Sequence, residues 1–499
     1  MKRNQILSIL FLFQISFLFA QKPNIVIIYA DDIGYGDFHC YYPQNKLQTP
    51  NVDKLAKEGL VFTRAYTTAA TCTPSRYSLL TGEYPWRKTG IKVLPGDATA
   101  LIKSGSPTIA SVFKNVGYET AVIGKWHLGL GDSLGPDWNA TIKESPNDIG
   151  FKYSYIMAAT GDRVPTVYVE NGKVVNLDLK DPIAIDYKNK IGNEPIGREH
   201  PELLKVKHSH GHDFTIVNGV GRIGYMSGGN AARWVDEDMA DTFTNKAVGF
   251  IETNKDKPFF LYFATHDVHV PRVPNARFAG KSGLGARGDA LLEFDWAVGE
   301  ILKTLELNGL NKNTLVILSS DNGPVLDDGY QDQAVELLGA HQPAGDLRGG
   351  KYSIFEAGTR VPFIVRYPGK VKPGVSNALI SQVDLIASLS TLIGQSTPKE
   401  AVDSQNQLNA LLGKDRIGRK DLVINTQSGG AYAIVEERWK YITPTDGQAK
   451  SRTNVELGNS PSPQLYDLKA DTRERNNLAE KETEEVKRLE KHLEEIRNK

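Results

Sequence analysis

The stretch Asn24-Ile25-Val26-Ile27-Ile28-Tyr29-Ala30, followed at once by Asp31-Asp32, says most about the fold of this chain. An apolar run without polar alternation is typical of a strand that is buried on both faces, as in a parallel sheet. In open α/β sheets, ligands bind beyond the carboxyl ends of such strands. We therefore expect Asp31 and Asp32 to belong to a binding site at that edge.

Three more apolar runs end in charged or imidazole side chains. They are Thr120–Ile123 before Gly124-Lys125-Trp126-His127, Pro258–Ala264 before Thr265-His266-Asp267-Val268-His269, and Thr314–Leu318 before Ser319-Ser320-Asp321-Asn322-Gly323. One polar turn after a strand is ordinary. Four such ends, with Asp, Lys and His in the same relative place, favour one shared site over four unrelated turns.

Helical patterns alternate with these runs. Residues Asp289 to Leu307 carry apolar side chains at a spacing of three and four, and Asn308-Gly309 gives a stop signal before the next apolar run. A shorter helix is expected from Pro50 to Gly59. This β–α–β order predicts an α/β fold with a large, mostly parallel sheet flanked by helices.

We divide the chain into three parts. Residues 1–20 combine a basic start with an apolar run too short to span a bilayer, which is typical of a signal peptide. Residues 21–390 form the expected main domain. Residues 391–499 form a smaller α+β subdomain, in which Ala431–Val435 and Trp439–Ile442 suggest antiparallel strands and Glu480–Lys499 a charged helix.

The charge balance excludes some partners. The chain of 499 residues has 59 basic and 59 acidic side chains. Non-specific nucleic-acid binding needs a basic excess, so no nucleic acid is expected as a partner. No run after residue 20 reaches the roughly 20 apolar residues of a membrane span. We expect an exported protein, periplasmic or secreted, without stable membrane insertion.

The two cysteines of the chain are Cys40 and Cys72. In an exported protein, two cysteines are consistent with a single disulfide. The surroundings of Cys72 favour another role, because Cys72-Thr73-Pro74-Ser75-Arg76 predicts a helix start at this cysteine. A helix N-terminus stabilises anions, and such a place suits a nucleophile. Cys40 is then expected to be a buried free thiol.

The motif Cys72-Thr73-Pro74-Ser75-Arg76, followed by Leu79-Leu80-Thr81-Gly82, resembles the signature of the type I sulfatases. The resemblance extends in ordered motifs from about Lys22 to Tyr367 and implies an alkaline-phosphatase-like fold. It also implies that Cys72 is oxidised to formylglycine (3-oxoalanine), whose hydrated aldehyde is the nucleophile. The implied partners are a formylglycine-generating or radical sulfatase-maturating enzyme and a sulfated oligo- or polysaccharide.

The resemblance assigns roles to matched positions. Oxygen ligands from carboxylates and an amide suit a hard divalent cation, and the family implies one Ca²⁺. The implied metal ligands are Asp31, Asp32, Asp321, Asn322 and the modified Cys72; the implied catalytic residues are Cys72, Arg76, Lys125, His127, His269 and Lys351; and the expected substrate-binding residues are Lys125, His266 and Lys351.

In the implied mechanism, Lys125 and Lys351 hold sulfate oxygens, and Arg76 steadies the nucleophile and the charge beside the metal. His269 protonates the leaving alcohol as general acid. His127 takes a proton from the second hydroxyl of the nucleophile, which expels sulfate. The predicted function is hydrolysis of sulfate esters on the sugars of a polysaccharide or glycan. A phosphonate or phosphodiester hydrolase and an inactive sulfated-glycan-binding protein are the alternatives.

Other patterns stay open. His208, His210 and His212 alternate, so they could ligate a second metal on one strand face, line a sugar subsite, or lie on an exposed loop, which we favour. Glu356 and Arg360 are expected to form a structural ion pair. Residues 133–229 look like loops and inserted strands that shape the site. The sulfated sugar, its sulfated carbon, exo or endo action and the oligomeric state do not follow from the sequence.

Overall fold

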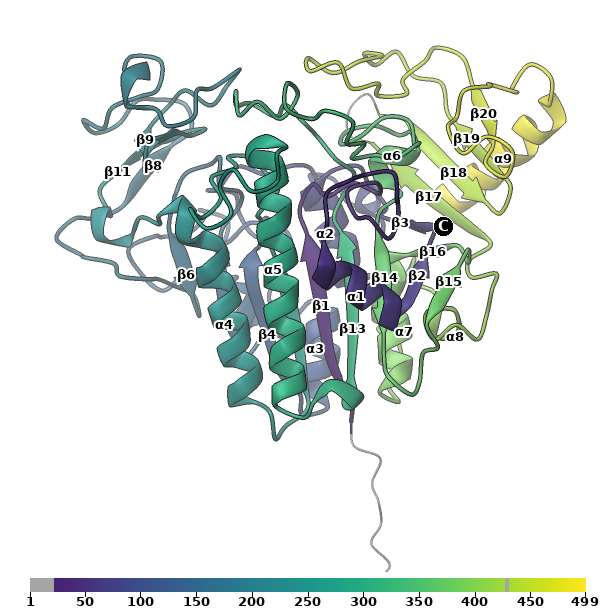
Figure 1. The fold of residues 1–499 in the computed structure, drawn as a ribbon, viewed down its shortest axis with the longest axis horizontal. Helices are drawn as coiled ribbons and strands as arrows, with labels where there is room; N and C mark the ends of the chain where they lie inside the picture. Colours follow the sequence, from purple (N-terminus) through teal and green to yellow (C-terminus); the bar gives the residue numbers. More distant parts are fainter. Residues whose placement is uncertain (1–21, 427–429) are drawn as a thin grey trace, which may run out of the picture.

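The computed structural model describes residues 22–426 and 430–499 (Figure 1). The predicted signal peptide therefore lies outside the described residues. No helix in the described part of the chain combines the length and the apolar composition that a membrane crossing needs.

A ten-stranded sheet forms the centre of the molecule. Its order is β15-β2-β14-β13-β1-β12-β4-β5-β6-β7. The bounds are β15 Gly374–Ser376, β2 Leu60–Phe62, β14 Phe363–Arg366, β13 Thr314–Ser320, β1 Asn24–Ala30, β12 Phe259–Ala264, β4 Glu119–Lys125, β5 Tyr153–Met157, β6 Tyr168–Glu170 and β7 Lys173–Val174. The five strands from β13 to β5 are parallel to their neighbours, while β14 and β6 are antiparallel. The predicted mostly parallel sheet is confirmed.

The four apolar runs of the sequence are the central strands β13, β1, β12 and β4. Every residue of β1 is buried, and its side chains alternate between two cores. Ile25, Ile27 and Tyr29 pack on one face, and Val26, Ile28 and Ala30 pack on the other. This two-sided burial explains why the sequence shows no polar alternation here.

Helices cover both faces. One core includes residues of α1 (Pro50–Glu58), α4 (Met239–Thr253) and α5 (Gly285–Leu307), and α4 and α5 lie side by side in front of the strands in Figure 1. The other core includes residues of α2 (Cys72–Thr81), α3 (Ile109–Asn115) and α7 (Leu385–Leu392). Helix α5 starts four residues before its predicted beginning, and Asp289 within it accepts backbone hydrogen bonds from Gly280 and Ser282 of the preceding loop.

Two additions flank the carboxyl edge of the sheet (Figure 1). Within residues 133–229, β5, β6 and β7 extend the large sheet, which the sequence did not predict, and the remainder carries short strand pairs: β8 (Ala184–Asp186) with β11 (Tyr225–Ser227), and β9 (Ile216–Val217) with β10 (Val220–Gly221). On the other side, β3 (Ala65–Tyr66) pairs with β16 (Ile380–Ser381), near the short helix α6 (Glu356–Thr359).

The C-terminal part has a sheet of its own. Its four antiparallel strands are β17 Asp421–Asn425, β18 Tyr432–Glu436, β19 Trp439–Ile442 and β20 Gln464–Asp467, and α9 (Thr483–Arg497) packs Leu489 and Leu493 into the same core. The predicted antiparallel subdomain and its charged helix are confirmed. Helix α8 (Leu408–Leu411) still packs on the core of the large sheet. The division at residue 390 stays a prediction.

Candidate active site

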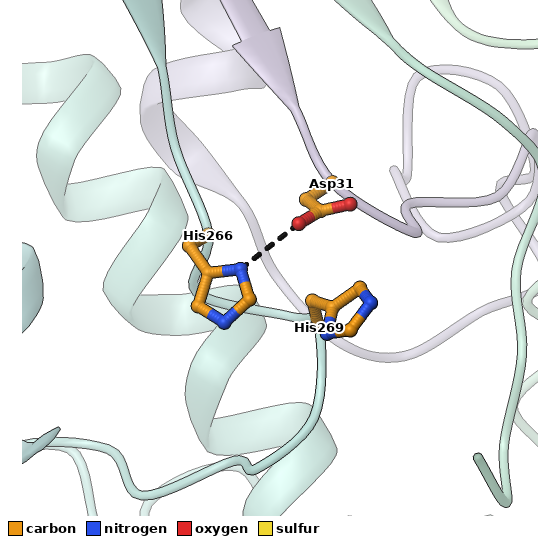
Figure 2. A group of neighbouring side chains, drawn as sticks. All are labelled: Asp31, His266 and His269. Atoms are coloured by element: carbon orange, nitrogen blue, oxygen red, sulfur yellow. Dashed lines mark hydrogen bonds and ion pairs between the residues drawn. The ribbon is translucent and has the colours of Figure 1, made fainter. Parts of the chain in front are cut away.

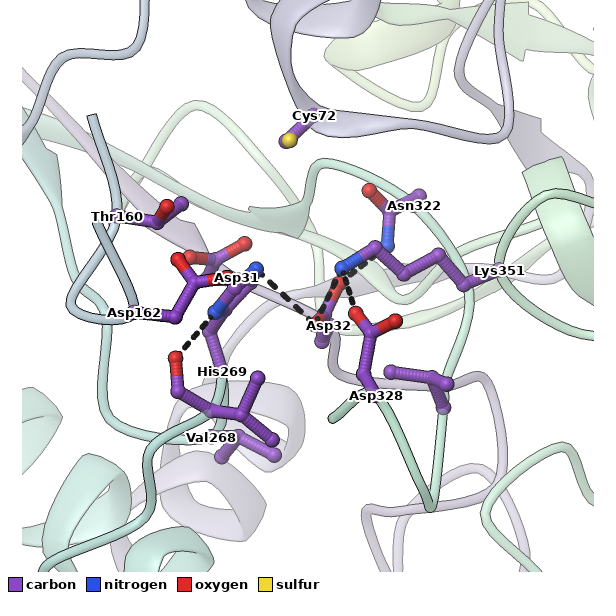
Figure 3. A network of polar contacts seen from close by, with 12 residues as sticks. Asp31, Asp32, Cys72, Thr160, Asp162, Val268, His269, Asn322, Asp328 and Lys351 are labelled. Atoms are coloured by element: carbon purple, nitrogen blue, oxygen red, sulfur yellow. Dashed lines mark hydrogen bonds and ion pairs between the residues drawn. The ribbon is translucent and has the colours of Figure 1, made fainter. Parts of the chain in front are cut away.

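The polar ends of the four central strands meet at the carboxyl edge of the sheet. Lys125, the last residue of β4, places its Nζ 2.6 Å from Oδ2 of Asp31, which follows β1. Lys351 comes from the loop before α6, and its Nζ lies 2.9 Å from Oδ2 of Asp32. Figure 3 shows Asp31, Asp32 and Lys351 around one space, with Cys72 on one side. The sequence prediction of a shared site is thus consistent with the geometry.

Cys72 is the first residue of α2, as its motif predicts. The preceding Thr71 is extended, and Gly82 ends the helix in the left-handed region, with φ 73°. Both cysteines are free. The alternative of a Cys40–Cys72 disulfide is therefore wrong. Cys40 is a free thiol as expected, but it is partly exposed at the edge of the core rather than fully buried.

His127 directs one ring nitrogen at the sulfur of Cys72. Its Nδ1 lies 3.2 Å from Sγ, and its Nε2 lies 2.9 Å from the carbonyl oxygen of Leu94. Since a carbonyl only accepts, Nε2 carries the proton and Nδ1 presents a lone pair. Burial holds the pKa of His127 well below its usual value, and the positive charges of Lys125 and Arg163 act in the same direction. His127 is thus arranged as a neutral base.

Three carboxylates and one amide form a group that can hold a metal ion. Ligand oxygens of Asp31, Asp32 and Asp321 all lie within 4.8 Å of one another. Oδ1 of Asn322 is buried and has no hydrogen-bond partner among the described residues, while its Nδ2 donates to Asp32 at 2.7 Å. A buried, unpaired carbonyl oxygen costs about 1–3 kcal/mol. A hard cation would satisfy it, so these residues fit a divalent ion held by oxygens.

The carboxylates of this group repel one another. Burial raises the pKa of Asp321 to about 7, and the charge of Asp31 adds to the rise. Arg76 opposes it, donating to Oδ2 of Asp321 from Nε at 3.0 Å and from Nη2 at 2.7 Å. Arg76 is fully buried and lies beside Asp321 and Asp31, so its charge offsets that of these carboxylates.

His266 and His269 lie beside Asp31 (Figure 2). Nδ1 of His266 donates to Oδ2 of Asp31 at 2.9 Å, and its Nε2 accepts the backbone N–H of Gly161 at 2.9 Å. Both ring nitrogens thus have hydrogen-bond partners inside the protein. His266 is therefore suited to hold the carboxylate of Asp31 in position. Contact of His266 with substrate stays a prediction.

His269 leaves one nitrogen directed into the site. Its Nδ1 donates to the carbonyl of Val270 at 2.7 Å, and its Nε2 lies 3.7 Å from Oδ2 of Asp32. The ring is buried and lies between Asp162 and Asp32 in Figure 3. Its Nε2 is therefore the atom that a leaving-group oxygen could reach.

Sequence reasoning missed Asp328. Its Oδ2 lies 2.8 Å from Nζ of Lys351, and the hydroxyl of Tyr352 donates to its Oδ1 at 3.0 Å. Burial alone would lower the pKa of Lys351, because it disfavours the charged ammonium group. The negative charges of Asp32 and Asp328 have the larger effect, and the pKa of Lys351 lies well above its usual value. The acidic pair Asp327-Asp328, soon after Asp321-Asn322, was the available signal.

Asp162 and Thr160 were also missed; they line the site opposite Lys351 (Figure 3). Nε2 of His212 lies 3.0 Å from Oδ2 of Asp162. Neither His208, His210 nor His212 belongs to a metal-ligating group within the described residues. The favoured exposed loop is wrong for His212, which is 6% exposed.

The ion pair predicted between Glu356 and Arg360 is present, with Nη1 of Arg360 3.2 Å from Oε2 of Glu356. A second cation, Lys440 on β19, also pairs with Glu356, with its Nζ 3.0 Å from Oε1. Tyr66 donates to the same carboxylate as Arg360. The pair therefore belongs to a buried ionic cluster behind the site, as expected of a structural role.

Comparisons with known proteins identify the family of this chain. The sulfatase family profile matches residues 23–395. The chain is 53% identical to an N-acetylgalactosamine-6-O-sulfatase of Bacteroides thetaiotaomicron, over 96% of this chain and 94% of that protein. It is 32% identical to human arylsulfatase A, over 92% of this chain and 84% of that protein.

Solved structures give the same result. A sulfatase from work on glycosaminoglycan metabolism in Bacteroides thetaiotaomicron superposes with a TM-score of 0.95 at 53% identity, covering 96% of this chain and 100% of that one. A sulfatase of Pseudoalteromonas sp. shares the fold alone, with a TM-score of 0.68 at 22% identity, over 95% of this chain and 89% of that one. The fold implied by the resemblance is confirmed. The chain belongs to the sulfatase family and is a sulfuric ester hydrolase.

Proposed function

We propose that this protein is an exported sulfatase that removes the 6-sulfate of N-acetylgalactosamine residues in a sulfated glycan. The arrangement of Cys72 against the free Nδ1 of His127, beside two buried lysines, carries the proposal. The choice of sugar is supported by the name of the relative that is 53% identical over nearly the whole chain.

The nucleophile is proposed to be formylglycine made from Cys72 by a maturation enzyme. Burial raises the pKa of the Cys72 thiol, against the opposing charges of Lys125 and Lys351. An unmodified thiol at this place is therefore mostly protonated and a poor nucleophile. Hydrated formylglycine supplies a nucleophilic hydroxyl oxygen at the same position.

The proposed metal ion is Ca²⁺, held by Asp31, Asp32, Asp321 and Asn322. All four ligands offer oxygen, which Ca²⁺ prefers, and the unpaired Oδ1 of Asn322 supports this assignment. Bound there, the ion supplies Lewis-acid polarisation of a sulfate oxygen. Arg76 forms an ion pair with Asp321 and so offsets part of the negative charge of the carboxylate ligands.

The other residues position sulfate and move protons. Nζ of Lys125 lies beside Asp31 and Nζ of Lys351 beside Asp32, so their ammonium groups can hold sulfate oxygens and offset charge in the transition state. His269 acts as general acid in its imidazolium form, with a proton on each nitrogen, and gives the Nε2 proton to the leaving alcohol oxygen; burial and the charge of Lys351 lower the pKa of His269, while the charge of Asp31 opposes this and favours the protonated ring. His127 accepts a proton at Nδ1 from the nucleophile. Each assignment uses the ring nitrogen that the protein leaves without a backbone partner.

The test is a release assay. Protein produced together with a sulfatase-maturation enzyme is incubated with N-acetylgalactosamine 6-sulfate, its 4-sulfate isomer, an aryl sulfate and an aryl phosphonate, and free sulfate is measured by ion chromatography. We expect the 6-sulfated sugar to give the highest kcat/KM. Phosphonate as the preferred substrate would support the phosphonate hydrolase, and binding without turnover of any ester would support the glycan-binding protein.

Export is tested separately. In the native host, we expect cell fractionation to find the protein outside the cytoplasm, with Gln21 as its first residue. A cytoplasmic protein that begins with Met1 would contradict the proposed signal peptide.

A further inference from the structure

Lys351 belongs to a tight segment that contains two adjacent glycines. Gly349 has φ 87°, and a Cβ there would lie 2.3 Å from Oγ of Ser353. A Cβ on Gly350 would lie 2.7 Å from the carbonyl oxygen of Pro324. The backbone can approach its neighbours this closely only without side chains, but glycine also gives it more conformational freedom than any other residue. The segment therefore needs fixed points on either side of the glycine pair to hold Lys351 in one place.

Backbone hydrogen bonds to the active site fix the segment after the glycine pair. The N–H of Lys351 donates at 2.9 Å to the carbonyl of Pro324, which lies in the loop after β13. The N–H of Tyr352 donates at 2.8 Å to the carbonyl of Ala70, two residues before Cys72. These bonds relate the backbone of Lys351 to the nucleophile and to the loop that follows the metal group.

Arg348 fixes the segment before the glycine pair. Its Nε and Nη2 donate to the two carboxylate oxygens of Glu456 at 2.8 and 3.3 Å, and its Nη1 donates to the carbonyl of Glu474 at 2.8 Å. The guanidinium carbon lies 3.9 Å from the centre of the Phe355 ring. The Arg348 carbonyl accepts the N–H of Ala357 at 2.9 Å. All three guanidinium nitrogens thus have partners, so both ends of this side chain are held.

The partners of Arg348 belong to the C-terminal part. Glu456 lies in the loop between β19 and β20, and Glu474 lies after β20. A backbone contact runs beside them, because the N–H of Ile354 donates to the carbonyl of Leu457 at 3.0 Å. The segment that carries Lys351 is thus bonded to the active site through one set of contacts and to the C-terminal part through another.

We propose that Arg348 is a positioning residue for Lys351, and that the C-terminal part contributes to catalysis through this contact. The inference rests on the proposed function, in which Lys351 holds a sulfate oxygen. A lysine ammonium group ends a flexible stem of four carbons, so its place depends on where the backbone holds the stem. The paired hydrogen bonds of Arg348 with Glu456 have a fixed geometry. A shift of about 1 Å in a group that positions substrate can cost about 100-fold in rate.

The test is a double-mutant cycle with Lys351, measured on an aryl sulfate with enzyme in excess so that a single turnover is followed. Arg348→Gln should lower the rate about 30-fold. Arg348→Lys keeps the charge but lacks the planar fork, so it should restore only part of the rate. In a protein that already carries Lys351→Ala, adding Arg348→Gln should change the rate by less than about twofold, because no ammonium group is left to position.

The crystal structure of Arg348→Gln gives a second reading, in which we expect Nζ of Lys351 to be displaced. A wild-type rate in Arg348→Gln, a further fall of about 30-fold when it is added to Lys351→Ala, or an unmoved Nζ would overturn the proposal. Arg438→Gln breaks an exposed ion pair with Asp467 in the C-terminal sheet and is the control, with an unchanged rate. If Arg348→Gln does not fold, Glu456→Gln enters the same cycle, because its side chain is 42% exposed and it loses the same contact.

Failure of the proposed function gives a different result. If the matured wild type releases no sulfate from aryl or sugar esters, or if Lys351→Ala keeps the wild-type rate, the role assigned to Lys351 is wrong and this inference is wrong with it. If Lys351→Ala is slow while Arg348→Gln is as fast as wild type, only the positioning role of Arg348 is wrong.

Discussion

Nδ1 of His127 lies 3.2 Å from Sγ of Cys72, and the opposite nitrogen of the ring is tied to the carbonyl of Leu94 at 2.9 Å. His127 has φ 56°, a backbone conformation that L-residues seldom adopt. Its N–H donates to the Ala158 carbonyl, and its own carbonyl accepts from Thr73. The tight turn after β4 is therefore bonded to α2 itself, which fixes the base against the nucleophile.

Replacing this base is the first prediction. His127→Gln keeps a polar side chain but cannot take up a proton. We expect kcat on N-acetylgalactosamine 6-sulfate to fall about 1,000-fold, within the range for loss of a general base. His200→Gln, on an exposed histidine, serves as the control and should keep its activity. A loss of less than tenfold in His127→Gln would argue against His127 as the base.

The pH profile gives a second prediction. A base must be neutral to act, and burial keeps the pKa of His127 well below its usual value of about 6.5. Lowering the pH from 8 to 6 should therefore not reduce kcat through protonation of this ring. The decisive comparison is the pH dependence of kcat in wild type and His127→Gln. An acid limb near pH 6.5 that disappears in the variant would contradict the prediction.

The site residues that the sequence predicted are those that lie next to a recognisable strand or helix end. Cys72, Lys125, His127 and Asp321 each stand at the end of a buried strand or the start of a helix, so burial and caps mark their places. Arg163 and Asp162 lie in a loop without periodicity, and their partner His212 is 50 residues away in the chain. Such contacts arise from folding of the whole insertion. The prediction of an exposed loop failed for His212 because this ring contacts Asp162 and packs on Tyr330, two residues that are distant in the sequence.

Metal removal is the third prediction. Stripping the protein with a chelator should abolish sulfate release, and Ca²⁺ should restore it. Burial raises the pKa of Asp321 to about 7, so without metal this carboxyl takes up a proton as the pH falls through that value. Protons then compete with the cation, and Ca²⁺ affinity should weaken from pH 8 to pH 5.5. Calorimetric titration at both pH values checks this. Equal affinities would show that Asp321 is not a ligand.

Modification of Cys72 is the fourth prediction. Trypsin should release a peptide of residues 65–76, between Arg64 and Tyr77. In protein from its native host, the mass of this peptide should be about 18 Da below that of the unmodified sequence, because a thiol is replaced by an aldehyde. Cys72→Ala should lose activity, whereas Cys40→Ala, which removes the other free thiol, should keep it. An active protein whose peptide has the full cysteine mass would overturn the formylglycine mechanism.

The last prediction concerns the attachment of the C-terminal sheet. Nζ of Lys440 lies 3.0 Å from Glu356 and 2.9 Å from Glu474, and all three side chains are fully buried. Lys440→Met leaves Glu474 in the interior without its cation and leaves Glu356 with Arg360 alone, which should lower the free energy of unfolding by about 3 kcal/mol. Lys469→Met removes only an exposed pair with Glu437 and should change it by less than about 0.5 kcal/mol.

The pH dependence separates a charge effect from a packing effect. Without Lys440, the pKa of Glu474 rises further above that of the unfolded chain, because Lys440 is the cation that lowers it. Burial already raises that of Glu474 to about 7. The folded variant then binds protons more tightly than the unfolded chain, so its deficit against wild type should shrink as the pH falls from 8 to 5. Denaturant unfolding at both pH values measures this. A deficit that is independent of pH would mean that lost packing of the lysine stem, rather than unpaired charge, destabilises the variant.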